Sequence, residues 1–175
     1  LYGQSTIVGE TSTVHCERGY YNTRNDIGHF VKNSRIDYEN RIMYGDSIYF
    51  NRNKNFASAT NNIRIIDTLN DSYVRGHYAE VFKNKDSVFI TKRAVAITVR
   101  ENDSIYIHAD TLKITGKPDR RVLRGFYKAR FFKRGLPGKE PTSGKCDSIY
   151  VNERTGITKL LRNPILWSGE NQMTG

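Results

Sequence analysis

The side chains that could do chemistry in this sequence are few and scattered. The four histidines (His15, His29, His77 and His108) do not have the spacing of metal ligands. The sequence has no GxSxG, HExxH or glycine-rich phosphate loop, so the signatures of common hydrolases, zinc proteases and nucleotide-binding enzymes are missing. We therefore expect a protein that is not an enzyme and that holds no metal and no cofactor.

Three carboxylates recur in one context, because Asp-Ser-Ile-Tyr occurs at Asp46–Tyr49, Asp103–Tyr106 and Asp147–Tyr150. A catalytic group is needed once per site, whereas a turn residue is needed once per turn. Asp and Ser at a strand entry can accept hydrogen bonds from turn N–H groups, so the three copies favour a structural role. Hydrolysis of glycosides by carboxylates on a β-solenoid stays open as an alternative.

The two cysteines, Cys16 and Cys146, are too few for a disulfide framework and too far apart in sequence for a zinc site. We predict two partly buried thiols. A disulfide between them requires a fold that brings the two ends of the chain together, and an elongated stack keeps them apart.

The composition indicates a chain that is low in apolar residues, basic and rich in strand-forming residues. Its 175 residues suit one domain, and 28 Lys and Arg against 18 Asp and Glu give a net charge of +10. The apolar share, with glycine counted and tyrosine left out, is about 39%, below the usual ~45–50%. A compact protein of this mass exposes roughly 8,700 Å², and the low apolar content predicts a flatter or more elongated body.

Strand-forming residues dominate, since Val, Ile, Thr, Phe, Tyr and Trp total 60 while Leu and Ala total 15. No apolar window approaches the roughly 18 residues of a membrane helix, and the sequence after Leu1 does not resemble a signal peptide. We expect an all-β fold and a mature or trimmed piece of chain.

Strand-like stretches follow one another about every ten residues, with turns rich in Asn, Asp, Gly and Lys between them. A longer loop is expected at Gly135–Lys145. In Tyr73–Phe82 we place Val74, Gly76, Tyr78 and Phe82 on one face, and a switch of faces near Thr91–Ala94 predicts a bulge. The predicted strands are Arg41–Asn51, Phe56–Ile66, Ser72–Phe82, Ser87–Val99, Ser104–Ile114 and Arg121–Phe132.

A second repeated element, Arg-Gly-aromatic-Tyr, occurs at Arg18–Tyr21 and Arg124–Tyr127, and with His in the ring position at Arg75–Tyr78. Gly19 to Gly76 and Asp46 to Asp103 share one offset of 57 residues. We interpret residues 1–175 as a single domain with an internal repeat, in which stacked antiparallel strands bury a continuous interior. Such a stack has open edge strands at both ends, which can pair with another chain.

These repeated residues resemble the LptA/OstA-like family of lipopolysaccharide-transport proteins, particularly its Bacteroidetes-type members. The resemblance covers Thr13 to Gly175 and rests on several short motifs that are specific only together. They are Cys16–Thr23, Tyr44–Tyr49, Ala57–Ile63, Arg75–Ala79, Asp103–Thr111 and Asn163–Trp167.

The resemblance implies an elongated, solenoid-like β-jellyroll of antiparallel strands with open ends. It also implies a periplasmic, non-catalytic protein that binds the acyl chains of lipid A in an apolar groove and bridges the inner- and outer-membrane machinery. Partners are then lipopolysaccharide, like OstA-fold domains paired edge to edge, and further copies of the chain, but no nucleic acid. A periplasmic N-terminal domain of an LptD-like outer-membrane assembly protein is the alternative within the family.

A lipid-carrying groove needs inward apolar side chains. Our candidates are Ile48, Phe50, Ile63, Ile65, Val74, Tyr78, Phe82, Ile90, Val95, Ile97, Ile105, Ile107, Leu112 and Ile114. Phosphorylated head groups would be bound by cations at the groove rim, and the candidates are Lys92, Arg93, Arg100, Lys128, Arg130, Lys133 and Arg134. The same charge, interleaved with aromatic residues in Arg124–Arg134, keeps a nucleic-acid- or polyanion-binding β-domain as the alternative of another class.

Overall fold

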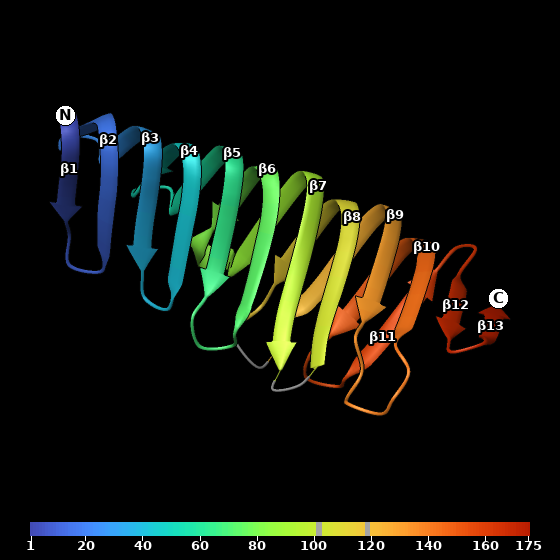
Figure 1. The fold of residues 1–175 in the computed structure, drawn as a ribbon. Coiled ribbons are helices and arrows are strands. Elements are labelled where there is room, and N and C mark those ends of the chain that lie inside the picture. The colour runs from blue at the N-terminus through green and yellow to red at the C-terminus, as the bar shows by residue number, and fades with distance from the viewer. Residues whose placement is uncertain (101–102, 118–119) are drawn as a thin grey trace.

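The protein is one long antiparallel sheet in which each strand pairs with its neighbours in sequence (Figure 1). The computed structural model describes residues 1–100, 103–117 and 120–175. Within them lie 13 strands and one short 3₁₀ helix, η1 (Lys83–Lys85). The strands are β1 (Tyr2–Val8), β2 (Ser12–Asn22), β3 (Ile27–Tyr38), β4 (Arg41–Asn51), β5 (Phe56–Asp67), β6 (Ser72–Phe82), β7 (Ser87–Arg100), β8 (Asp103–Thr115), β9 (Val122–Lys133), β10 (Thr142–Asn152), β11 (Ile157–Leu161), β12 (Ile165–Ser168) and β13 (Asn171–Thr174).

Every strand from β2 to β10 bends near its middle, where the pairing register shifts. In the odd-numbered strands the bend consists of two successive residues with positive φ, a conformation that Asn tolerates better than most residues. These pairs are Lys32–Asn33, Asn61–Asn62, Lys92–Arg93 and Tyr127–Lys128. Because the bends lie next to one another, they fold the whole sheet along one line.

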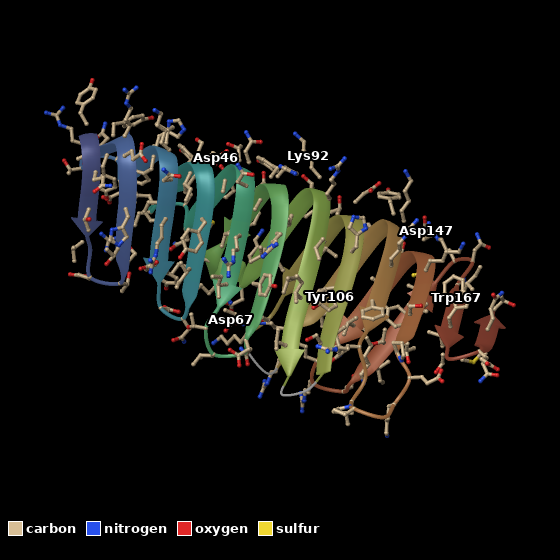
Figure 2. All side chains as sticks on the ribbon, viewed as in Figure 1. Asp46, Asp67, Lys92, Tyr106, Asp147 and Trp167 are labelled. Carbon is tan, nitrogen blue, oxygen red and sulfur yellow. The ribbon has the colours of Figure 1, made fainter. Side chains whose placement is uncertain are left out.

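The fold line divides the sheet into two layers that face each other (Figure 1). Leaf A contains the first halves of the even strands and the second halves of the odd strands, and it continues into β12 and β13. Leaf B contains the other halves and ends at β11. We call the line of bends the ridge, and the opposite side, where hairpin turns join the strands, the mouth. In Figure 2, Asp46, Lys92 and Asp147 lie along the ridge, and Asp67 lies on the mouth side.

The core lies between the two leaves, because alternate residues of every strand point inward. Leaf A contributes one continuous row of paired residues that includes Ile36, Met43, Ile65 and Val74. Leaf B contributes the row Phe30, Ile48, Ala59, Ala79, Ile90 and Leu112. The chain exposes 11032 Å², well above the roughly 8,700 Å² of a compact protein, which confirms the elongated body.

The six strands predicted from the sequence are confirmed to within one residue at each end. The predicted bulge near Thr91–Ala94 is confirmed as the bend of β7. The loop expected at Gly135–Lys145 is shorter, because β10 already begins at Thr142. Within the described residues, no helix is long and apolar enough to cross a membrane.

The prediction that the repeated Asp residues mark strand entries is wrong for two of the three copies. Asp46 and Asp147 lie at the ridge inside β4 and β10, where Asp46 accepts a hydrogen bond of 2.8 Å from Asn62 and Asp147 pairs with Arg162 at 3.4 Å. Asp103 begins β8, so it occupies a different position in its strand. The position that recurs at the ridge, roughly every thirty residues, is held by Glu17, Asp46, His77, Asp110 and Asp147.

Candidate functional site

The apolar interior holds a cavity of about 300 Å³ in the N-terminal half of the molecule. Leaf A contributes Val14, Ile36 and Met43 to its wall, and leaf B contributes Phe30 and Phe50. The bends position these side chains, because they bring the inward faces of both halves of each strand together. A volume of this size is at the lower limit of small-molecule sites, which span about 300–1,000 Å³.

Cations gather where this interior reaches the mouth. Arg41, Arg52 and Lys83 line the 300 Å³ cavity beside its apolar residues. Arg41 and Arg121 line a smaller cavity of about 50 Å³ further along the mouth. The arrangement combines an apolar wall with positive charge at its edge, which suits a molecule with an apolar tail and an anionic head.

Among the residues that the structure describes, three polar contacts join the two leaves across the mouth, and we call them the clasp. Glu10 of the β1–β2 turn lies 3.9 Å from Arg52 of the β4–β5 turn, and both side chains are exposed. The Lys83 ammonium lies 4.1 Å from the centre of the Tyr38 ring. The third contact is a salt bridge in which Arg121 donates to the carboxylate of Asp67.

Asp67 and Arg121 form the buried member of the clasp, with exposed fractions of 8% and 7%. Burial alone would raise the pKa of the Asp67 carboxyl. Hydrogen bonds from Arg121 and Asn70, with the positive charge of Arg121, outweigh burial and hold this pKa below its usual range. The backbone N–H of Leu69 also donates to this carboxylate at 3.0 Å, so Asp67 is fixed and ionised at neutral pH.

Ten of the fourteen candidate groove residues lie in the interior. Seven are buried members of the core, and Phe50, Ile105 and Ile114 pack against it. The structure brings them together from both leaves. The seven are Ile48, Ile63, Ile65, Val74, Ile90, Ile107 and Leu112.

The other four candidates point away from the interior, so their placement in the groove is corrected. In β6 the inward residues are Val74 and Gly76 before the bend and Ala79 and Val81 after it, which leaves Tyr78 and Phe82 on the outer face. In β7 the inward residues after the bend are Ala94 and Ala96, which leaves Val95 and Ile97 outside. In β6 the bend adds one residue to the inward alternation and so exchanges the two faces of the strand. In β7 it adds two residues, so Val88, Ile90, Ala94 and Ala96 all stay on the inward face.

The candidate basic rim is also corrected. Lys92, Arg93 and Lys128 are exposed bend residues at the ridge, on the side opposite the mouth. Figure 2 shows Lys92 there. Arg130 lies on the outer face of leaf A, because the neighbouring Ala129 and Phe131 point inward. Lys133 and Arg134 lie at the mouth end of β9, and the side chain of Arg100 lies outside the described residues.

The cations that do border the interior were missed in the sequence. Arg41, Arg52, Lys83 and Arg121 lie at strand ends or in turns, which a search for dense basic clusters passes over. A usable signal was present, since every hairpin turn of a folded sheet lies at the mouth.

The two cysteines are free and buried, as predicted. Cys16 lies in β2 and Cys146 in β10, eight strands apart, which corresponds to roughly 38 Å at the usual strand spacing of about 4.8 Å. Burial raises the pKa of both thiols.

The basic segment Arg124–Arg134 does not form one continuous strip. The bend at Tyr127–Lys128 divides it between the leaves, so Arg124 lies over Tyr150 on leaf B while Arg130 lies on leaf A. In the part of the chain that the structure describes, no group of three or more His, Cys, Asp or Glu residues is placed to hold a metal ion.

Comparison with solved structures supports the architecture. The crystal structure of LptH from Pseudomonas aeruginosa, described as the LptA-homologous periplasmic component of the lipopolysaccharide transport device, superposes with a TM-score of 0.59 at 12% sequence identity. The match covers 70% of this chain and 82% of that one. No family model and no curated protein matches the sequence. On the evidence of its folded antiparallel sheet and this similarity, the chain has the LptA/OstA-like fold.

Proposed function

We propose that the protein is a non-catalytic, periplasmic carrier of lipopolysaccharide that holds an acyl chain of lipid A between its two leaves. The observation that supports this most is the continuous apolar interior, whose cavity of about 300 Å³ is lined by both leaves and bordered by cations. The LptA-like fold supports the same class of cargo, since LptH is a component of a lipopolysaccharide transport device.

The chemistry of this cargo matches the two parts of the site. An acyl chain gains about 0.8 kcal/mol for each CH₂ group that it buries, and it needs no fixed polar partner. The phosphates of lipid A need donors at the edge of the apolar region, and Arg41, Arg52 and Lys83 supply them. Binding by an apolar wall and by cations at its edge requires no reacting group, as expected of a carrier.

The clasp gives the carrier a closed and an open form. A cavity whose volume is at the lower limit of ligand sites accommodates one acyl chain rather than the several acyl chains of lipid A. Binding of more than one acyl chain requires the leaves to separate at the mouth, which breaks contacts such as Asp67–Arg121. Uptake therefore exchanges contacts between the leaves for contacts with the phosphates.

Bridging and self-association belong to the same proposal. β1 and β13 are edge strands at opposite ends of the sheet, and their unpaired backbone groups can extend the sheet into another OstA-like domain or a second copy. This arrangement also suits the domain of a larger outer-membrane assembly protein. Sedimentation of the purified chain over a range of concentrations tests self-association, and a strict monomer throughout contradicts it.

Photocrosslinking tests the proposed cargo at single-residue resolution. Benzoylphenylalanine is placed at Phe50, which faces the cavity, and in a matched variant at Tyr49, its outward neighbour on β4. After irradiation with lipopolysaccharide, we expect a crosslinked adduct at position 50 and little at position 49.

Equal labelling at the two positions indicates non-specific contact and contradicts the proposal. Absence of an adduct at position 50 also contradicts it, provided that both variants have the circular dichroism spectrum and thermal midpoint of the wild type.

A further inference from the structure

The outer face of leaf A carries a concave feature that shares no lining residue with the two cavities of the interior. A cleft of about 630 Å³ lies beside the β9–β10 loop. Its walls are Phe132 of β9 and Trp167 of β12, and Ser143 of β10 lies between them. Figure 2 labels Trp167 on β12, near the C-terminal end of the sheet.

The sheet register produces this cleft. Ser143 pairs with Phe132 on one side and with Trp167 on the other, so the three side chains share one face. Two strand spacings, about 9.5 Å, separate the two aromatic residues. Because Ser143 is small, a slot remains between the two rings. Phe132 packs instead against Tyr106, with ring centres 6.2 Å apart.

Polar and charged groups surround the slot. Lys139 and Glu140 of the β9–β10 loop line its mouth-side end. On its ridge side the next outward residues of β9 and β10 are Arg130 and Lys145, which pair with each other in the register. The Lys145 ammonium lies 5.7 Å from the centre of the Trp167 ring. Within the described residues, no carboxylate forms an ion pair with Arg130, Lys139 or Lys145.

We propose that this slot binds a negatively charged sugar unit. A pyranose ring is flat enough to enter between two aromatic side chains, and its C–H faces pack on their π-surfaces. Its hydroxyl groups can bond with Ser143 and Glu140, and a carboxylate or phosphate on the ring can bond with Lys145 or Arg130. The three cations Arg130, Lys139 and Lys145 outnumber the one carboxylate, Glu140, so the site favours an acidic sugar over a neutral one. The inference goes beyond the proposed function, because it uses no residue of the interior.

The experiment uses Trp167 as its reporter, since it is the only tryptophan in the chain. The full chain is titrated with a tetrasaccharide of alternating glucuronic acid and N-acetylglucosamine while tryptophan fluorescence is recorded. We expect a saturable change, with at least tenfold weaker binding of the neutral N-acetylglucosamine tetramer. Ser143→Leu, which fills the slot, and Lys145→Gln should each weaken binding at least fivefold. Tyr20→Ala removes an exposed ring of leaf B and should leave binding unchanged.

Three results overturn the proposal: no saturable change with the acidic tetrasaccharide, equal affinity for the neutral one, or an equal response to hexaglutamate, which indicates an acidic peptide site. Lipopolysaccharide crosslinking at position 50 is measured on the same Ser143→Leu variant. Loss of sugar binding with crosslinking retained separates the two sites, and it also shows that the variant is folded.

Discussion

The salt bridge between Asp67 and Arg121 gives the sharpest test of how the two leaves are held together. In Asp67→Asn the side chain keeps its size but loses its charge, so the buried Arg121 guanidinium has no counter-ion. Removing one partner of a buried ion pair costs about 3–5 kcal/mol. We expect the free energy of unfolding in urea at pH 7 to fall by this amount. In a chain of this length the melting temperature should fall by about 2–4 °C for each kcal/mol.

Replacing both partners separates the cost of an orphaned charge from the value of the pair. In Asp67→Asn/Arg121→Met no charge remains buried, so most of the lost stability should return. Asp71→Asn, in the exposed turn after Asp67, is the matched control and should change the free energy of unfolding by less than about 0.5 kcal/mol. A loss below about 1 kcal/mol in Asp67→Asn refutes the reasoning, as does a double variant less stable than the single one.

The pH dependence of the same pair has a definite sign. The pKa of Asp67 in the folded protein lies below the value of about 3.9 for an unfolded chain. The stability that its ionised carboxylate contributes is therefore complete above about pH 4 and is lost as the pH falls through the lower, folded-state pKa. The difference in unfolding free energy between wild type and Asp67→Asn should be constant from pH 7 to about pH 5 and should shrink in stronger acid. A difference that grows on acidification contradicts this assignment.

Three further changes test the ridge and the core. Gly76→Val should lose about 1–3 kcal/mol of unfolding free energy in urea, because a Cβ there would clash with the side chain of Ile90; wild-type stability would show that the bend is not tightly packed. Asn62→Ala should cost about 1–2 kcal/mol, since it removes a hydrogen bond and leaves a Cβ-bearing residue at a φ of 49°; Asn62→Gly should cost less, and the reverse order would contradict the argument. Cys16 and Cys146 should react with a thiol reagent such as dithiobisnitrobenzoate only after unfolding, because both are buried and their thiol pKa values are raised; rapid labelling of the native chain would contradict their placement.

The strands were predictable because their ends carry a clear signal. Stretches such as Arg41–Asn51 and Ser72–Phe82 lie between turns rich in Asn, Asp and Gly, and turn chemistry is local. The bulge in β7 was predicted at the right place, although the switch of faces expected there does not occur, since Val88, Ile90, Ala94 and Ala96 all point inward. The predicted fold class follows from these local signals and from the resemblance together.

The bends explain what could not be predicted. Asn61–Asn62 is a recognisable candidate for positive φ, but Lys92–Arg93 and Tyr127–Lys128 are not, because tertiary packing imposes that conformation on them. In β6 the unrecognised bend moves the later residues to the opposite face, which is why Tyr78 and Phe82 were assigned to the interior. In β7 a switch of faces was expected but does not occur, which is why Val95 and Ile97 were assigned there. The cations at the mouth lie at strand ends and in turns that are predictable one by one, but their gathering beside the interior follows only once the sheet is known to be folded.

The recurrence of the ridge position also bears on the dimensions of the molecule. Each hairpin contributes its own pair of bent strands and forms backbone pairs only with the hairpins beside it. One more or one fewer hairpin therefore changes the length by two strand spacings, about 9.5 Å, while the cross-section stays the same. In such an array the free energy of unfolding is close to the sum of the stabilities of the single hairpins and of the interfaces between them. The length of the protein can therefore change only in discrete steps, which are set by the number of hairpins that its gene encodes.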